Sequence, residues 1–193
     1  SMGRVHSRAS EKEERTRMIR INGLADPAWT APTHGCDFDI KYLERGLETW
    51  NVDADPVYQR GHVWTNEQRS AFLGYWLQGG TVPTLWVWEP PSSKEDSGEA
   101  RPELIDGKQR MTAFLMWWHD EIAANVDGRM IYAKETDKRF RVHHMIHLTF
   151  VRLDSRADVL RFYLRLNGGG TPHSPNELAR VRALLDEEEN KQQ

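Results

Sequence analysis

The chain has 193 residues, of which 38% are hydrophobic and 28% charged, a composition typical of a folded globular protein. Its formal net charge of -3 excludes a uniformly basic surface, so contact with nucleic acid would need a local basic patch. The single cysteine, Cys36, excludes an internal disulfide and a cysteine-based zinc cluster, and suits a reducing cytosol. No apolar run approaches the roughly 20 residues that span a bilayer.

The N-terminal third is predicted to hold an arm, one helix and a loop. Residues 1–36 are predicted to form a partly flexible arm, because residues 4–20 are charged and poor in apolar side chains. A helix is predicted to begin near Asp39, and Pro56 opposes any helix through residues 52–55. Residues 57–64 are predicted to be extended or looped. The helix is marked by apolar residues at near-helical spacing: Ile40, Leu43 and Leu47.

A second helix is predicted to start at Thr65, which can form a capping-box pair with Gln68, and to end at the glycines of residues 79–80. Residues 81–88 are rich in valine, leucine and tryptophan and predict a strand. Residues 90–102 are rich in Ser, Glu, Pro and Gly and predict a mobile surface loop. The apolar face of the helix is expected to comprise Phe72, Leu73, Trp76 and Leu77.

The central segment predicts a strand, a turn and a helix in immediate succession. Residues 103–105 form the strand, Gly107 supplies the turn, and the helix follows at once. Residues 120–141 are predicted to be a turn or an irregular hairpin, and residues 147–153 alternate enough to predict a further strand. The helix shows apolar residues at i, i+3, i+4 and i+7, namely Met111, Phe114, Leu115 and Trp118.

Two helices are predicted near the C-terminus. Ser155 and Asp158 open the first, and the Asn-Gly-Gly-Gly run at residues 167–170 ends it. The second begins around residues 174–177, where Ser, Pro and Glu fit the N-cap, N1 and N3 positions. Residues 183–193 are predicted to be a fraying tail. The expected apolar faces are Val159, Phe162, Tyr163 and Leu166 in the first helix, and Leu178, Val181 and Leu185 in the second.

The turn between the central strand and its helix has the chemistry of an anion site. A helix N-terminus presents unpaired backbone N–H groups and a positive dipole end, which attract phosphate. Lys108 and Arg110 lie in this first turn, where the dipole disfavours cations, so a shared anion would explain them. Gly107 permits close approach, and Asp106 could cap the helix, hold Arg110 or reach a phosphate-bound Mg²⁺. The alternative is a capped helix with an exposed lysine and arginine.

Three separated blocks of the sequence resemble one family. Residues 105–113, Ile-Asp-Gly-Lys-Gln-Arg-Met-Thr-Ala, resemble the DGQQR box of the GmrSD-type restriction-endonuclease N-terminal family, with lysine in place of one glutamine. Residues 56–64 are similar to its P-x-[YF]-Q-R-x-x-x-W segment, and residues 162–172 to its F-x-R-L-N-x-G-G segment. The blocks occur in the family's order and together span about Asp37 to Arg180.

The resemblance implies an α+β domain at residues 37–182 with the ParB/sulfiredoxin-like fold, in which a small mixed sheet packs against several helices. It also implies NTP binding and hydrolysis centred on Asp106, Gln109 and Arg110, with Asn167 as a metal or phosphate ligand. The change to Lys108 bears on base preference more than on phosphate binding. The expected catalytic residues are Asp106, Arg110 and Asn167. The expected nucleotide-binding residues are Tyr58, Gln59, Arg60, Gly107, Lys108, Gln109, Thr112, Arg165, Gly168 and Gly169.

The start of the helix at Thr65 is a second candidate for phosphate and metal contacts. Arg60 is expected to contact a phosphate, with a structural ion pair as the alternative. Glu67 is expected to help Asp106 and Asn167 hold Mg²⁺. Trp64 is expected to be a core or staple residue rather than a base-stacking platform, and Tyr58 either packs on a nucleotide base or is a core ring.

The histidines, the cysteine and the C-terminal arginines give weaker predictions of function. His143, His144 and His147 lack the helical context and the acidic or cysteine partners of a metal site, and Cys36 lacks a histidine signature. Arginines accumulate in the C-terminal third, either as a DNA-facing stripe or as a solvated face interleaved with acids. They are Arg139, Arg141, Arg152, Arg156, Arg161 and Arg165.

We therefore expect a cytoplasmic domain, in a bacterial or phage-infected bacterial cell, that binds and hydrolyses an NTP with Mg²⁺ in restriction or phage–host conflict. Family relatives usually carry an HNH-type nuclease domain, which this chain lacks, so little DNA cleavage is expected. The first alternative is a non-catalytic nucleotide sensor or protein-binding module, with a nuclease or another protein as partner. The second is a DNA-binding protein or weak nuclease. The sequence does not decide which nucleotide base is bound or whether the chain forms a homo-oligomer.

Overall fold

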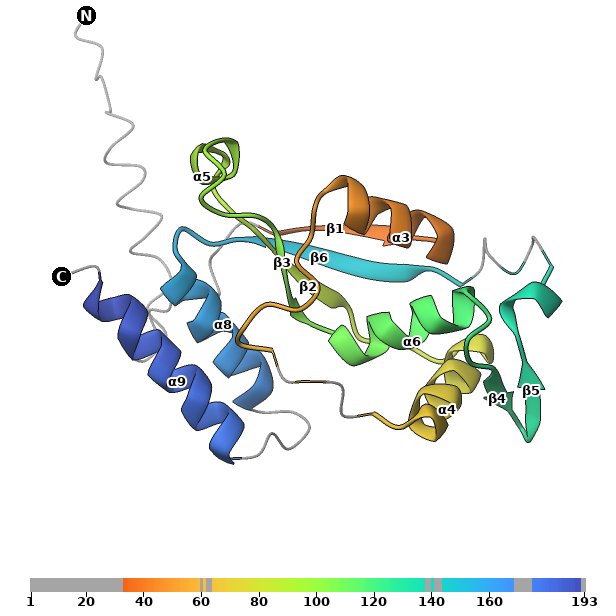
Figure 1. The fold of residues 1–193 in the computed structure, drawn as a ribbon. Helices are drawn as coiled ribbons and strands as arrows, with labels where there is room; N and C mark the ends of the chain where they lie inside the picture. The colour runs from red at the N-terminus through yellow and green to blue at the C-terminus, as the bar shows by residue number, and fades with distance from the viewer. Residues whose placement is uncertain are drawn as a thin grey trace, which may run out of the picture.

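The computed structural model describes residues 33–59, 61, 64–137, 140, 144–168 and 175–191, and shows a mixed α+β architecture (Figure 1). Its main sheet has four strands in the order β1-β6-β2-β3. β6 pairs antiparallel with β1 and parallel with β2, and β2 pairs antiparallel with β3, so the sheet is mixed. The strands are β1 (Thr33–Phe38), β2 (Leu85–Glu89), β3 (Glu103–Asp106) and β6 (Ile146–Arg152).

Helices cover both faces of this sheet. Successive side chains of a strand point to opposite sides, so each face of the sheet can pack against its own set of helices. In β2, Leu85 and Val87 belong to one buried cluster, and Trp86 and Trp88 pack with the other. The first cluster is shared with α3 (Ile40–Thr49), α4 (Asn66–Leu77) and α6 (Lys108–Trp118). The second is shared with α8 (Arg156–Gly168) and α9 (Pro175–Asn190), which lie side by side (Figure 1).

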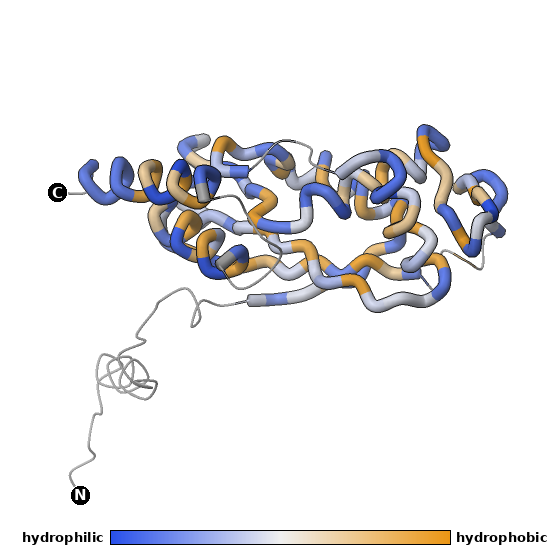
Figure 2. Tube along the Cα trace, turned by 90° about the horizontal axis from the view of Figure 1, so that it is seen from below, coloured by the Kyte–Doolittle hydropathy of each residue, from blue (hydrophilic) through white to orange (hydrophobic). Residues whose placement is uncertain are grey.

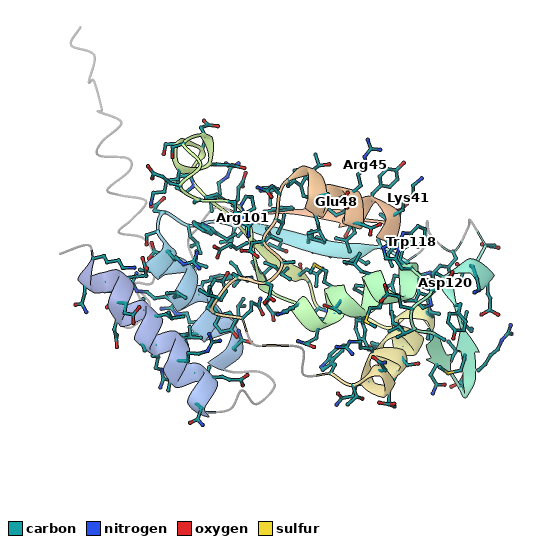
Figure 3. The ribbon with its side chains drawn as sticks, viewed as in Figure 1. Lys41, Arg45, Glu48, Arg101, Trp118 and Asp120 are labelled. Carbon is teal, nitrogen blue, oxygen red and sulfur yellow. The ribbon has the colours of Figure 1, made fainter. Side chains whose placement is uncertain are left out.

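Local signals in the sequence explain where the first helices begin. The Asp39 side chain accepts a hydrogen bond from the Tyr42 amide and caps α3. The Thr65 side chain accepts from the Gln68 amide while the Gln68 side chain accepts from the Thr65 amide, so the capping box predicted at α4 is confirmed. Figure 3 shows the charged side chains of Lys41, Arg45 and Glu48 projecting from the outer side of α3.

A small hairpin extends the structure beyond α6. β4 (Ala124–Val126) and β5 (Arg129–Ile131) pair antiparallel across Asp127 and Gly128, both of which have positive φ. This confirms the hairpin alternative for residues 120–141. The hairpin packs on α4, where the Ser70 hydroxyl donates to the Ala123 carbonyl at 2.5 Å. A single 3₁₀ turn (Ala133–Glu135) follows.

Several predicted boundaries were wrong. β1 occupies Thr33–Phe38 and places Cys36 in an exposed strand rather than in the arm assigned to residues 1–36. The loop predicted at residues 90–102 contains a short helix, α5 (Ser92–Asp96), and β2 starts only at Leu85. α9 continues to Asn190, so much of the predicted tail is helical; Figure 2 shows mainly hydrophilic residues in this last part of the helix.

Candidate functional site

A cavity of about 430 Å³ lies at the C-terminal end of β3, where helices from both faces of the sheet approach one another. Its volume is within the range of small-molecule sites. α6 contributes its first turn, α4 contributes aromatic side chains, and α8 contributes its last turns. The lining residues are Gln59, Trp64, Phe72, Tyr75, Thr81, Pro83, Asp106, Gly107, Lys108, Gln109, Arg110, Tyr163, Leu166 and Asn167.

The start of α6 opens directly into this cavity. Gly107 is its N-cap and has a φ of 105°, a backbone conformation that residues other than glycine rarely adopt. Because glycine has no side chain with which to cap the helix, the first backbone N–H groups of α6 are not satisfied by their own N-cap residue. The predicted strand–turn–helix is therefore confirmed, with an N-terminal dipole end facing a cavity.

Arg110 and Asp106 form an ion pair at the edge of the cavity. The Arg110 Nη2 atom lies 2.7 Å from Asp106 Oδ2, and Nη1 donates to the carbonyls of Pro83 and Thr84. The Arg110 side chain is only 12% exposed, and this burial lowers the pKa of Arg110, while the Asp106 carboxylate opposes the shift. Arg110 is thus a positioned cation whose orientation is set before any ligand arrives.

Lys108 is also paired within the chain. Its ammonium group bonds to the carboxylate of Asp55, and the lysine is 5% exposed, whereas Asp55 is 71% exposed. The two first-turn cations were predicted to share a bound anion, with a capped helix carrying an exposed lysine and arginine as the alternative. In the structure each has a carboxylate partner in the chain, so their presence does not by itself require an external anion.

Side-chain amides and Arg180 hold the loop that precedes α4 against the site. The Gln59 amide donates to the carbonyls of Leu104 and Ile105, both at 2.8 Å. The Gln109 side chain accepts from the Trp64 amide at 3.2 Å and donates to the Gly61 carbonyl at 3.1 Å. From α9, Arg180 donates to the carbonyls of Val57, Tyr58 and Gln59 at 2.6 to 3.1 Å.

The three blocks meet here only in part. Asn167 lies in the cavity with Asp106 and Arg110, and its side-chain amide donates to the Tyr163 carbonyl at 2.8 Å. Arg60 and Gly169 lie outside the described residues, and Gly168 is described only as the last residue of α8. The first block therefore contributes Gln59 and the third block Asn167 to the cavity that the DGKQR box, residues 106–110, also lines.

Other expected site residues lie away from the cavity lining. Tyr58 is fully buried in the second core cluster, so it is a core ring and has no surface for a base; burial and then Glu103 raise its pKa well above the ordinary value. Glu67 is exposed in the first turn of α4, where Thr65 lowers its pKa. Thr112 and Arg165 are partly buried and do not line the cavity.

His144 and His147, the two residues of the predicted histidine cluster that the structure describes, have separate partners. His144 contacts the carbonyls of Phe140 and Leu77, and His147 contacts Asp37. His143 lies outside the described residues. Within the part of the chain that the structure describes, there is no group of three or more His, Cys, Asp or Glu side chains placed to hold a metal ion.

Three of the C-terminal arginines that the structure describes are paired with acids. Arg152 bonds to Glu89, Arg156 to Glu103, and Arg161 to Asp158 and Glu189. This pattern favours the solvated, ion-paired face over the DNA-facing stripe. Arg139 and Arg141 lie outside the described residues.

Two contributions to the site were missed by the sequence analysis. Tyr75 lines the cavity and is 54% exposed, and Phe72 also lines it although it was assigned to the core. Arg180 fixes the loop from a distant helix. The exposed position of Tyr75, off the apolar stripe of α4, was a signal that could have been used, whereas nothing in the spacing of Arg180 indicated its partners.

The comparison with known families agrees with the site geometry. The sequence model of the family described as "GmrSD restriction endonuclease, N-terminal domain" matches residues 45–143, just over half of the chain. The chain belongs to this family. No curated protein matches it.

The match to the GmrSD N-terminal family contains two of the three blocks, at residues 56–64 and 105–113. The block at residues 162–172 lies beyond the matched region, yet its Asn167 lines the same cavity as Asp106. The match at residues 45–143 confirms the family resemblance for the first two blocks. Among the described residues, no helix is long and apolar enough to cross a membrane.

Proposed function

We propose that this GmrSD-family domain binds a nucleoside triphosphate with Mg²⁺ in the cavity at the start of α6 and hydrolyses it. The observation that carries the proposal is the meeting of Asp106, Arg110 and Asn167, from two distant segments, around one helix N-terminus. The phosphates would lie against the first backbone N–H groups of α6, with Gly107 allowing close approach. Lys108 and Arg110 add positive charge at the same end of the cavity.

The oxygen atoms that line the cavity fit a nucleotide-bound Mg²⁺. This ion usually takes one or two carboxylates together with substrate phosphates and waters. Asp106 is the only carboxylate among the described lining residues, and Asn167 adds an amide oxygen. We therefore assign Mg²⁺ to Asp106 and Asn167 and omit Glu67, because that side chain is exposed on α4 and does not line the cavity.

Arg110 would provide the electrostatic stabilisation that phosphoryl transfer requires. Charge on the transferred phosphoryl group is spread over its oxygens, and a positioned arginine can offset it. The Arg110 guanidinium is largely removed from water, which strengthens its interaction with an anion. The bond to Asp106 and the two carbonyl contacts keep it in place, so little reorganisation is needed on binding.

Phosphate release in the presence of Mg²⁺ tests hydrolysis. Arg110→Ala is expected to reduce turnover by about 100-fold or more, and Asp106→Asn, which keeps the side-chain shape, is expected to reduce it as well. Arg152→Ala is the matched control, because Arg152 is 61% exposed and pairs only with Glu89 on the sheet. Equal phosphate release from the wild-type protein and both site variants would contradict hydrolysis at this cavity.

A non-catalytic nucleotide sensor is the second candidate function. It is favoured by the pairing of Asp106 with Arg110, because a carboxylate that is already ion-paired is a weak base for activating water. In this case the nucleotide would stabilise the fold without being consumed. Saturable nucleotide binding with no phosphate release above the Arg110→Ala background would favour this function over hydrolysis.

We also infer that the domain adopts the ParB/sulfiredoxin-like fold and serves in restriction or phage–host conflict. Membership of the GmrSD N-terminal family and the mixed α+β architecture support both statements. A nuclease or another protein partner would then supply DNA cleavage. Loss of restriction of phage in cells carrying Arg110→Ala, with protein levels unchanged, is the expected result.

A further inference from the structure

The lining of the cavity includes two chemically different groups of side chains. The polar group comes from the start of α6 and from Asn167, and carries the charges of Asp106, Lys108 and Arg110. The aromatic group comes from α4 and the residue before its N-cap, and Tyr163 of α8 adds a further ring to the lining. The aromatic side chains of α4 and its start, which we call the aromatic wall, are Trp64, Phe72 and Tyr75.

The aromatic wall is anchored in the core at one end and exposed at the other. Trp64 and Phe72 have ring centroids 5.2 Å apart, and Phe72 lies 5.3 Å from Phe114, a fully buried ring of α6. Tyr75 follows Phe72 by three positions, so both side chains lie on neighbouring parts of one helix face. At 54% exposure, Tyr75 is the most exposed ring of the wall, and it lines both this cavity and a neighbouring hollow beside Gly80.

Gly80 fixes the position of the Tyr75 ring. A Cβ atom at position 80 would lie 2.4 Å from the Cε1 and Cζ atoms of Tyr75, closer than real side chains approach one another. The ring therefore packs directly on the backbone of residue 80, which no other amino acid would allow without displacing it. This contact restricts the positions open to the exposed Tyr75 ring, which lowers the conformational entropy lost when a ligand stacks on it.

We propose that the aromatic wall is the nucleobase subsite of the cavity, with Tyr75 as its main stacking surface. A ligand that carries both a flat ring and an anionic chain matches these two groups of lining side chains, and a nucleoside triphosphate has this form. Stacking on aromatic side chains accepts any base, because every base has a π face. The inference rests on the proposed function and specifies that the ligand is a nucleotide rather than an inorganic polyphosphate.

Calorimetric binding of ATP, CTP, GTP and UTP, and of inorganic tripolyphosphate as a probe without a base, tests this assignment in the presence of Mg²⁺. Tyr75→Leu is expected to weaken the binding of the preferred nucleoside triphosphate by about tenfold and to leave tripolyphosphate binding unchanged. Gly80→Ala, which displaces the ring, is expected to act in the same direction. Arg110→Ala is expected to weaken the binding of both ligands. Tyr42→Leu is the matched control, because Tyr42 is 57% exposed on α3 and does not line this cavity.

The outcomes separate the subsite from the proposed function. If Arg110→Ala weakens both ligands but Tyr75→Leu and Gly80→Ala bind the nucleotide as the wild-type protein does, the base subsite is overturned and the phosphate site stands. Equal loss of nucleotide and tripolyphosphate binding in Tyr75→Leu would also overturn it, because the ring would then act on the phosphates or on folding. If the wild-type protein binds none of these ligands, the proposed function fails and the subsite with it.

Discussion

At the scale of single residues, the candidate site combines groups whose charges are already balanced within the chain. Arg110 is paired with Asp106, and Lys108 with Asp55, so neither cation is buried without a carboxylate. A ligand phosphate would therefore join existing ion pairs rather than meet isolated charges. The residue that makes this arrangement possible is Gly107, since its backbone turns the chain from β3 into α6.

We expect Gly107→Ala to destabilise the protein more than Gly128→Ala does. Both glycines have positive φ, at 105° and 85°, so both substitutions carry a backbone cost of about 1–3 kcal/mol. At position 107 the new Cβ would also lie 2.3 Å from Leu85 Cδ2, in the buried core, whereas at position 128 it would meet no atom within 4 Å. Urea unfolding of the two variants measures the difference, and equal losses would contradict the close approach at Gly107.

At the scale of elements, α4 contacts the cavity on one side and the β4–β5 hairpin on another. Its C-terminal half carries Phe72 and Tyr75 of the aromatic wall, which line the cavity, and Gly74 packs against the hairpin. A Cβ at position 74 would lie 1.7 Å from the Asn125 carbonyl oxygen, so only glycine permits this contact. The hairpin in turn covers the part of the core that α4 and α6 share.

Gly74→Ala is expected to lower the free energy of unfolding by about 1–3 kcal/mol through overpacking, even though alanine is the better helix former. The comparison is Gly46→Ala in α3, where the new Cβ would meet only the half-exposed Trp50 ring at 3.0 Å. That variant should be close to neutral. Thermal unfolding of both variants checks this, and a stabilised Gly74→Ala protein would show that the hairpin can move away from α4.

The elements that could be predicted from the sequence are those with local signals. The capping box at Thr65, the glycine turn at residue 107 and the apolar spacing of α6 and α8 depend on neighbours in the chain. β1 could not be predicted, because its residues are mostly exposed and it becomes a strand through pairing with β6, more than a hundred residues away.

The site was predictable to the same extent. The DGKQR box and Asn167 could be assigned from their resemblance to a family, and they lie in one cavity. The pairing of Lys108 with Asp55, the clamp from Arg180 and the exposure of Tyr75 depend on tertiary packing, which the spacing of residues does not encode. Tyr58 was predicted either to pack on a nucleotide base or to be a core ring, and the structure confirms the core ring, whereas its neighbour Gln59 lines the cavity.

At the scale of the whole molecule, the cavity is lined by helices of both layers and by the end of β3, the edge strand of the sheet. α4 and α6 belong to one layer and α8 to the other, so a ligand in the cavity contacts elements of both. Binding to the folded state alone raises its stability by RT ln(1 + [L]/Kd). A nucleotide should therefore stabilise the domain as a unit.

The most direct test of a nucleotide site at the start of α6 is the thermal unfolding midpoint measured against nucleoside triphosphate concentration with Mg²⁺. At a ligand concentration about 100 times Kd, the added stability is about 2.7 kcal/mol, which raises Tm by about 5–10 °C for a chain of this size. We expect this rise in the wild-type protein and in Arg152→Ala, and a rise at least several-fold smaller in Arg110→Ala at the same concentration. A Tm that does not change with nucleotide, or that rises equally in the Arg110→Ala protein, would contradict a nucleotide site at this cavity.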